Sequence, residues 1–459
     1  MHSAVPRIII AGAASGCGKT TVVCALLQAL VSRGLRVAGF KCGPDYIDTM
    51  FHRSVIGVKS ANLDPFFFDG NTLNYLLSDG GKNTDISIIE GVMGYYDGIC
   101  VGSDGGSTQS LAARTESPAV LVVDAKGASR SLLAAVHGFF SFSPDSKIRG
   151  VIFNRCSPAV YASLKDEMEK AYGTALVPLG YLPCMDGCSF DSRRLGLVTA
   201  QETQDLREKL QILARQAELT VDIDGVMRLA AAAPPVCCAG IDVPSLPPVR
   251  IAVARDRAFC FYYEESLALL EKMGAELVPF SPIDDAALPE SIDGLYLGGG
   301  YPELHAEALS RNTSMLRSVK AALDGGLPCI AECGGFMYLN RSIGGFPAVG
   351  FLPGRSFDAG RLVRFGYVSL KAKNDNMLCR AGKVIRAHEF HYWDCDRIGD
   401  SFTAQKASSP SEWECVVSND RLFAGFPHFH FYSDMSLARS FCEACFKVRG
   451  MEPLPVFSG

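Results

Sequence analysis

The sequence predicts two α/β domains in one chain of 459 residues. In the first half, short apolar runs alternate with helical patterns, which is typical of a parallel sheet covered by helices. A stretch rich in Ala and Pro, Leu229–Pro248, interrupts this pattern, and a second alternation begins at Val249. Because one domain holds roughly 100–200 residues, a chain of this length needs at least two cores. We predict a first domain over 1–230, a linker over 231–248 and a second domain over 249–459.

Six apolar runs in the first half are predicted strands, each ending in glycine or a polar residue: RIIIAG, VAGFKCG, ISIIEGVMG, AVLVVDAKG, IRGVIFNRC and ALVPLGYLP. Between the first two, Lys19–Arg33 has apolar residues at helical spacing. In the second half we expect strands at Val249–Ala254, in GLYLGGG and in PCIAECGG, and a strand-rich region from about Gly360 to Phe431. Ligands of parallel sheets bind at the carboxyl ends of the strands.

The composition excludes several classes of protein. Hydrophobic residues make up 48% and charged residues 20%, which fits a soluble globular enzyme rather than a disordered chain. A net charge of −5 with no basic cluster argues against a nucleic-acid partner. No run approaches the roughly 20 apolar residues of a membrane span, and Met1–Arg7 does not begin a signal peptide. We therefore expect a cytoplasmic protein whose 17 cysteines are mostly free, buried thiols.

The segment GAASGCGKTT, Gly12–Thr21, lies between the first strand and the first helix. Backbone N–H groups of such a loop and the helix N-terminus bind phosphates, with Lys19 reaching the terminal phosphates and Thr20 holding Mg²⁺. The pattern departs from the common one at Ala13, where a glycine is usual. We expect the nucleotide to bind through Gly16, Gly18, Lys19, Thr20 and Thr21.

Acidic residues follow two other strands. Asp45 and Asp48 lie in FKCGPDYID, and Glu90 and Asp97 lie in IIEGVMGYYDG. Mg²⁺ binds through carboxylates and phosphate oxygens. Any single one of these residues can equally be a loop or cap residue, because Asp is common in turns. Taken as a set, they favour a metal and activation site.

Cys333 lies in PCIAECGGF, between an apolar strand and a glycine pair, as a nucleophile on a sharp strand-to-helix turn requires. Gly334 N–H and either Gly299 or Gly300 would then form an oxyanion hole. The base would come from GFPHFHF, which supplies His428 and His430. The alternative is that this cysteine is a small buried hydrophobe, as we expect the other sixteen to be.

Taken together, these motifs give a specific resemblance. The chain resembles the cobyrinate a,c-diamide synthase family of corrin biosynthesis through SGCGKTT, FKCGPDYIDT, NLDPF, IEGVMGYYDG, VIFNR, RLGL, LGGGYPEL, AECGGFMYL, RFGY, HEFHY and HFHF. The resemblance implies a dethiobiotin-synthetase-like P-loop domain followed by a class I glutamine amidotransferase-like domain. It also implies that ATP, with Mg²⁺, phosphorylates acetate carboxylates of a tetrapyrrole, and that ammonia released from glutamine converts them to amides.

The resemblance assigns roles to individual residues. It implies that His428 is the base, that Asn154 reads adenine and that His430 occupies the position of an orienting Glu in related amidotransferases. It places metal ligands at Thr20, Asp45 and Glu90, and catalytic roles at Lys41, Asp45, Asp48, Asp97 and Cys333. We expect Glu332 and Glu303 to hold the glutamine pocket or its backbone rather than to react.

Two other motifs have ordinary interpretations. HEFHY, His388–Tyr392, is expected to be structural or to lie at an interface, and the pair Cys442–Cys445 is weak evidence for a metal.

Two departures from the family pattern leave alternatives open. SRRLGL has Ser192 and Arg194 where the family has Glu and His, and GFP precedes the final histidines. An added Arg suits a polycarboxylate, either cobyrinate or hydrogenobyrinate, or a sirohydrochlorin-type ring such as sirohydrochlorin, its nickel complex or siroheme. A regulatory nucleotide-binding protein or a free-standing glutaminase would leave one half of the motifs unexplained. We expect no membrane partner, and a homodimer is one option.

Overall fold

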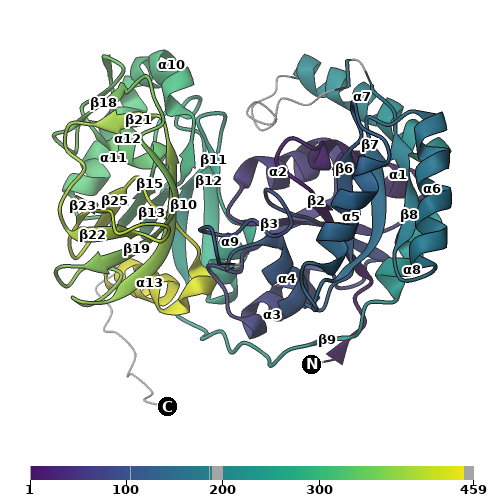
Figure 1. Cartoon of the computed structure of the whole chain (residues 1–459). Coiled ribbons are helices and arrows are strands. Elements are labelled where there is room, and N and C mark those ends of the chain that lie inside the picture. Colours follow the sequence, from purple (N-terminus) through teal and green to yellow (C-terminus); the bar gives the residue numbers. More distant parts are fainter. Residues whose placement is uncertain (1, 104, 186, 189–199, 449–459) are drawn as a thin grey trace. The chain divides into compact units, whose positions relative to one another are not determined.

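The computed structural model describes residues 2–103, 105–185, 187–188 and 200–448 (Figure 1). The chain divides into two compact units, Met1–Ile241 and Asp242–Gly459, and each has its own hydrophobic core. Ser192 and Arg194, where the sequence departs from the family pattern, lie outside the described residues.

The first unit is built on a seven-stranded parallel sheet with the order β4-β3-β5-β2-β6-β7-β8. Its strands are β2 (Arg7–Gly12), β3 (Val37–Cys42), β4 (Lys59–Leu63), β5 (Ile86–Glu90), β6 (Ala119–Asp124), β7 (Ile148–Asn154) and β8 (Val177–Leu182). The predicted parallel sheet is thus confirmed. The sequence does not predict β4, because its residues KSANL form no apolar run and the strand lies at the edge of the sheet.

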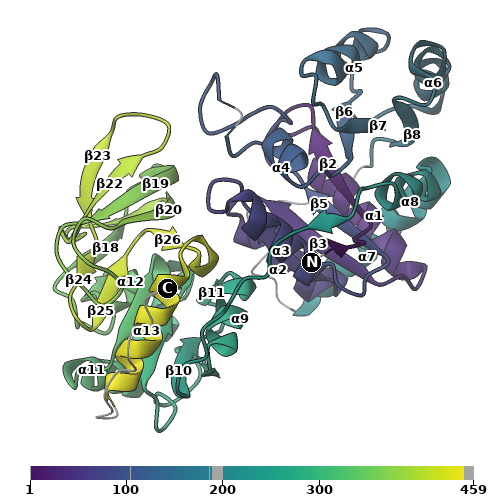
Figure 2. The same ribbon diagram turned by 90° about the horizontal axis from the view of Figure 1, so that it is seen from below.

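Helices cover both faces of this sheet. They are α1 (Lys19–Ser32), α2 (Tyr46–Phe51), α3 (Gly70–Gly80), α4 (Thr108–Arg114), α5 (Ser131–Ser141), α6 (Pro158–Tyr172), α7 (Ala200–Thr220) and α8 (Ile223–Ala231), and α2 continues into the π-helical turn η1 (His52–Ile56). The core combines buried side chains of α1, α7 and α8 with those of the sheet. Figure 2 shows these three helices on one side of β6, β7 and β8, and α5 and α6 on the other.

The predicted linker, 231–248, is partly ordered against the first unit. Its residues Val236–Cys237 form β9, which pairs antiparallel with β1 (His2–Ser3). The buried Arg7 donates a 2.8 Å hydrogen bond to the carbonyl of Pro234. An Ala/Pro-rich composition does not predict such a short strand pair. The part of this stretch up to Ile241 belongs to the first unit, and the part from Asp242 belongs to the second.

The second unit contains a six-stranded sheet with the order β12-β10-β13-β15-β25-β24, parallel except at β24. Its strands are β10 (Val249–Ala254), β12 (Ala275–Phe280), β13 (Gly294–Leu297), β15 (Cys329–Glu332), β24 (Val417–Ser418) and β25 (Leu422–Gly425). The helical elements are α9 (Glu264–Lys272), η2 (Pro302–His305), α10 (Ala306–Arg311), α11 (Thr313–Asp324), α12 (Gly334–Leu339), η3 (Phe431–Ser433) and α13 (Met435–Val448). The predicted second α/β domain is confirmed.

Smaller sheets complete the second unit. A five-stranded antiparallel sheet contains β19 (Arg364–Ala372), β20 (Val384–His391), β22 (Phe402–Lys406), β23 (Glu412–Cys415) and β26 (His428–Phe429). The others contain β11 (Phe259–Phe261) with β14 (Gly299–Gly300), and β16 (Ser342–Ile343), β17 (Phe346–Pro347), β18 (Arg355–Asp358) and β21 (Trp393–Cys395). Among the described residues, no helix combines the length and apolar character that a membrane crossing requires.

Candidate functional site

The glycine-rich loop of the first unit runs from the end of β2 into α1. Gly16 and Gly18 have φ values of 78° and 89°, in the left-handed region that favours glycine. A Cβ on Gly18 would lie only 1.9 Å from Asn154 Nδ2, whereas Gly16 faces open space. At the departure from the common pattern, the backbone N–H of Ala13 donates to Val122 O at 3.0 Å. The backbone of the loop is thus hydrogen-bonded to β6 at the position where alanine replaces the usual glycine.

Two side chains at the start of α1 are directed to neighbouring groups of the same unit. Lys19 Nζ donates to Met93 O at 2.9 Å, and the Thr20 hydroxyl donates to Glu90 Oε1 at 2.7 Å. Burial and the nearby Lys41 lower the pKa of Lys19. The structure therefore brings the predicted phosphate ligand Lys19 and the predicted metal ligands Thr20 and Glu90 to one edge of the sheet, where β2 and β5 end.

A buried charge cluster lies beside the loop. Lys41 and Glu90 are cross-strand partners on β3 and β5, with Lys41 Nζ 3.0 Å from Glu90 Oε1, and Lys41 also forms a short ion pair with Asp48. All three side chains are at most 6% exposed. Burial opposes ionisation of Asp48, but the charge of Lys41 outweighs it and holds the pKa of Asp48 below its ordinary value. Removing one member would leave its partners charged in a buried site.

The other two predicted acids have local hydrogen bonds. Asp45 Oδ1 accepts from Ile47 N at 2.8 Å and caps α2, and Asp97 Oδ2 accepts from Gly94 N at 2.9 Å. Burial, with the repulsion of Asp48, raises the pKa of Asp45 to about 7. Both residues thus have the cap or turn contacts that the ordinary interpretation expects, and their catalytic roles stay predictions.

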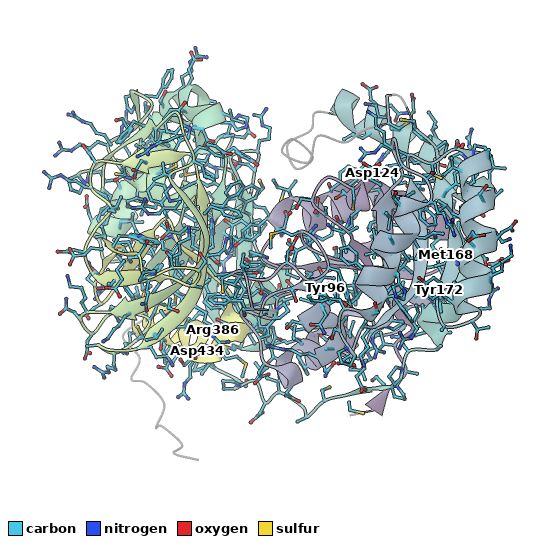
Figure 3. All side chains as sticks on the ribbon, in the orientation of Figure 1. Tyr96, Asp124, Met168, Tyr172, Arg386 and Asp434 are labelled. Carbon is cyan, nitrogen blue, oxygen red and sulfur yellow. The ribbon has the colours of Figure 1, made fainter. Side chains whose placement is uncertain are left out.

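Two residues at the end of β7, Asn154 and Arg155, donate hydrogen bonds to the backbone of the glycine-rich loop. Asn154 Nδ2 donates to Cys17 O at 3.0 Å, and Arg155 donates to Gly16 O at 3.1 Å. Asp124, at the carboxyl end of β6 (Figure 3), accepts from Arg155 Nε at 2.8 Å. Sequence reasoning missed Arg155 and Asp124, although both lie in strand-end motifs. The reading of adenine by Asn154 stays a prediction.

The edge of the sheet fits a magnesium ion held jointly with phosphate. Glu90 Oε2 is buried without a hydrogen bond among the described residues and lies 3.7 Å from the buried His52 Nε2, and burial lowers the pKa of His52. No group of three or more His, Cys, Asp or Glu side chains forms a metal site in the described ranges. Mg²⁺ is usually bound by one or two carboxylates plus substrate phosphates. Here Glu90 provides one carboxylate, and the Thr20 hydroxyl lies beside it.

In the second unit, Cys333 occupies a strained turn between β15 and α12. Its φ is 47°, unusual for a residue with a side chain, and its N–H donates to Gly425 O at 2.7 Å. A Cβ on Gly335 would lie 2.2 Å from Leu297 O, so the following turn requires glycine. This is the geometry of a nucleophile elbow. Burial, with the charge of Glu303, raises the pKa of the Cys333 thiol, so a base is needed to form the thiolate.

Three glycines converge beside this turn. Gly300 has a φ of 152°, and a Cβ there would lie 2.1 Å from Ala258 O. A Cβ on Gly334 would lie 3.2 Å from the backbone nitrogen of Gly300, and one on Gly299 would lie 2.6 Å from His428 Cε1. The predicted oxyanion residues and the predicted base therefore come together although they are far apart in sequence.

His428 is the first residue of β26, opposite His388 on β20. Its Nδ1 lies 3.1 Å from Glu332 Oε2, and its ring stacks on that of His388 with centroids 5.1 Å apart. The side chain of His430 contacts a different group, because its Nδ1 lies 3.4 Å from Ser266 Oγ. The sequence analysis did not predict the contact between Glu332 and His428. In the sequence, Glu332 is notable only because it precedes the candidate nucleophile, and this position does not indicate a contact with a distant histidine.

The remaining motifs of the second unit have separate surroundings. His388 Nε2 lies 2.9 Å from the Tyr263 hydroxyl, and His391 Nδ1 lies 2.6 Å from Trp393 O, so the two histidines of HEFHY have different partners. Cys442 and Cys445 are buried thiols of α13, and no metal cluster among the described residues contains them.

Comparison with known proteins shows what this chain is similar to. Residues 8–189 match the CobQ/CobB/MinD/ParA nucleotide binding domain family, and residues 250–435 match the CobB/CobQ-like glutamine amidotransferase domain family. Proteins called cobyrinate a,c-diamide synthase match nearly the whole length. The one from Listeria monocytogenes is 39% identical, covering 94% of this chain and 97% of its own. That from Salmonella typhimurium is 40% identical, covering 92% and 94%, and that from Thermoplasma volcanium is 39% identical, covering 96% and 98%.

Proposed function

Because this chain belongs to the cobyrinate a,c-diamide synthase family, a family of glutamine-hydrolysing carbon–nitrogen ligases, we propose that it amidates the a- and c-acetate carboxylates of cobyrinate or hydrogenobyrinate. Each carboxylate is first converted to an acyl phosphate by ATP, and ammonia then displaces the phosphate. The observation that supports the proposal is that one chain carries two different candidate sites. The first unit has a phosphate loop beside a buried charge cluster, and the second has a cysteine elbow with a histidine.

In the first unit, the phosphate groups of ATP are bound by the backbone of the loop and by Lys19. Lys41 lies within the buried cluster and is held ionised there, although burial opposes it, by Asp48 and Glu90. A fixed cation of this kind stabilises charge that develops on a transferring phosphoryl group without reorganisation of solvent. A carboxylate is otherwise a poor acyl donor, so this step makes the later attack by ammonia feasible.

Thr20 and Glu90 would hold Mg²⁺ in this site. The ion supplies neutralisation of phosphate charge and orientation of the phosphate oxygens. The pair fits this role because the Thr20 hydroxyl already contacts Glu90 and because the second oxygen of Glu90 has no hydrogen bond among the described residues.

In the second unit, His428 removes the proton of the Cys333 thiol, and the thiolate attacks the side-chain carbonyl carbon of glutamine. The N–H groups of Gly334 and Gly300 stabilise the oxyanion that forms. The protonated His428 gives its proton to the departing nitrogen, which leaves as ammonia. Water then hydrolyses the thioester to glutamate and restores the thiol.

The test is an assay with ATP, Mg²⁺ and glutamine in which cobyrinate and sirohydrochlorin are compared side by side. We expect ATP-dependent conversion of cobyrinate to a monoamide and then a diamide, resolved by the masses of the products, with release of glutamate. Amidation of sirohydrochlorin but not of cobyrinate would contradict the proposed substrate. Amidation of either compound without ATP would contradict the proposed acyl-phosphate intermediate.

A further inference from the structure

The contacts of His428 indicate how the base is held. Its Nδ1 lies 3.1 Å from Glu332 Oε2, and both side chains are at most 3% exposed. The ring of His388 covers one face of the imidazole at an interplanar angle of 21°. The edge that carries Nε2 faces Gly299, where a Cβ would lie 3.2 Å from Nε2. Nδ1 is thus directed to a carboxylate, and Nε2 to the predicted oxyanion loop.

Backbone pairing sets the position of this carboxylate. Glu332 is the last residue of β15 and lies opposite Gly425 on β25. The next residue, Cys333, donates its N–H to the carbonyl of the same Gly425. His428 follows Gly425 by three residues. The nucleophile and the carboxylate are therefore positioned by one pair of adjacent parallel strands, β15 and β25, and the base lies on β26, shortly after β25 in the chain.

His430, at the position expected to hold an orienting group, has a different environment. Its Nδ1 accepts the N–H of Tyr432 at 3.1 Å and lies 3.4 Å from Ser266 Oγ, and its ring lies 4.5 Å from that of Tyr263. Burial lowers the pKa of His430 to about 3. A neutral imidazole has no negative charge to offset the positive charge that a base acquires, and Nδ1 of His430 already accepts a hydrogen bond from Tyr432 in η3.

The second oxygen of Glu332 is also contacted by a neutral group. The hydroxyl of Tyr296 on β13 lies 3.5 Å from Glu332 Oε1. Burial raises the pKa of Tyr296 well above its ordinary value, so the phenol keeps its proton and donates. Burial also raises the pKa of Glu332, an effect that the contact with His428 opposes. The carboxylate is thus surrounded by donors on both oxygens.

We propose that Glu332 is the positioning residue of the glutaminase site, supplying from the position before the nucleophile the carboxylate that related amidotransferases supply two residues after the histidine. The proposal rests on the proposed function of Cys333 and His428. Glu332 accepts a hydrogen bond from the Nδ1–H group of His428, which leaves the Nε2 lone pair to take the proton of the Cys333 thiol. It then stabilises the imidazolium by its charge and does not itself take the proton.

The central experiment compares Glu332→Gln with wild type in steady-state glutamine hydrolysis, with ATP and cobyrinate present. We expect kcat to fall at least about 10²-fold, because an amide keeps the shape but removes the charge. We expect KM for glutamine to stay within about threefold. Amidation supported by ammonium chloride should keep its wild-type rate, because it does not use Cys333. A kcat within about threefold of wild type would overturn the proposal.

The pH profile gives a readout that a merely structural residue would not change. In the proposed mechanism the carboxylate of Glu332, 3.1 Å from His428 Nδ1, stabilises the positive charge that His428 acquires when it takes the thiol proton. Removal of this negative charge should therefore shift the acidic limb of kcat/KM. Other titratable groups that face this site are common to both proteins: His388 beside His428, Tyr262 and Tyr296 beside Glu332, and Glu303 and Glu389 beside Cys333. Burial raises the pKa of Glu303 to about 7, so its titration appears in both profiles. An unchanged limb in Glu332→Gln would contradict the role.

Two further variants keep the test decisive. His430→Asn retains an acceptor near the position of Nδ1, and we expect its glutaminase kcat to stay within about fivefold of wild type. A loss confined to this variant would assign the orienting role to His430 instead. Both tryptophans, Trp393 and Trp413, lie in the second unit, so their fluorescence reports its folding. If Glu332→Gln does not fold, Glu332→Asp replaces it. Charge is then kept, so we expect a lower kcat with the acidic limb unmoved, and an unaltered kcat would overturn the proposal.

Failure of this proposal can be distinguished from failure of the proposed function. A wild-type protein that hydrolyses glutamine but leaves cobyrinate unchanged contradicts the substrate only, and the Glu332 variants are then compared by glutamate release alone. A wild-type protein without glutamine hydrolysis under any condition contradicts both.

Discussion

The two units prepare their sites in different ways. In the first unit, the reactive groups are charged side chains that neutralise one another, with Lys41 between Asp48 and Glu90 and with Lys19 on a backbone carbonyl. In the second, the reactive geometry lies in the backbone, with Cys333 and Gly300 at positive φ values. A ligand of the first site must therefore exchange contacts that already exist, whereas a ligand of the second meets a strained, fixed frame. Substitutions in the buried charge cluster of the first unit should act through charge, and those at the backbone positions of the second, such as Gly300, through shape.

The largest expected effect separates the two chemistries completely. Cys333→Ala should lower glutamine-supported amidation at least about 10³-fold, because no nucleophile remains to release ammonia. Amidation supported by ammonium chloride should remain within about threefold of wild type. Product masses with each nitrogen source provide the measurement. Loss of both activities would show that the two sites do not act independently.

The reciprocal change lies in the charge cluster. Asp48→Asn should lower amidation with either nitrogen source by about 10²-fold, because Lys41 loses its ion-pair partner and the phosphoryl group its fixed cation. Glutamine hydrolysis, measured as glutamate release, should remain. As a control of the same chemical change, Asp97→Asn tests an acid whose contact is local to its loop; an effect as large as that of Asp48→Asn would place Asp97 in the activation step.

A smaller pair of effects compares two glycines. Gly300→Ala should reduce glutamine hydrolysis by about 10²-fold, because the Cβ would collide with Ala258 O and displace an oxyanion donor. Gly16→Ala meets open space and should cost only about 1 kcal/mol for its left-handed φ. The rate of glutamine hydrolysis and the thermal unfolding of both variants are measured to test this contrast. Equal losses of stability in the two variants would show that an added Cβ is tolerated no better at Gly16 than at Gly300.

The smallest effect concerns pH. The folded protein keeps a proton on Asp45 up to about pH 7, whereas the ordinary value is 3.8. Stability from this proton is present at acidic pH and is lost as the pH rises through about 7, by roughly 1–3 kcal/mol. Asp45→Asn should flatten this slope between pH 4 and 7. Hydrogen exchange of α2 measures this pH dependence of stability, and Asp79→Asn, at an exposed position, is the control. An identical slope in both variants would contradict the raised pKa of Asp45.

Local sequence pattern predicted most strands of the first sheet and a set of candidate reactive residues, but not the contacts between them. Apolar runs marked six strands of the first sheet, and flanking glycines marked Cys333. The pattern failed at β4, a polar edge strand that the sheet alone stabilises. It also missed the contact of Glu332 with His428, because residues 96 positions apart meet only through the pairing of β15 with β25. Arg155 was missed for the same reason, since its partner Gly16 is 139 positions away.

The pairing of β15 with β25 also has a consequence for folding during translation. The strands of the first sheet are all synthesised by Leu182, so this unit can fold while the rest is being made. The site at Cys333, in contrast, is incomplete until Leu422–Gly425 and His428 have been synthesised, which come 89 to 95 residues later in the chain. Until then, β15 presents an open strand edge. Chains that stop short of β25 should therefore lack glutaminase activity and be prone to aggregate, so that ammonia is released only by molecules whose activating unit has already been completed.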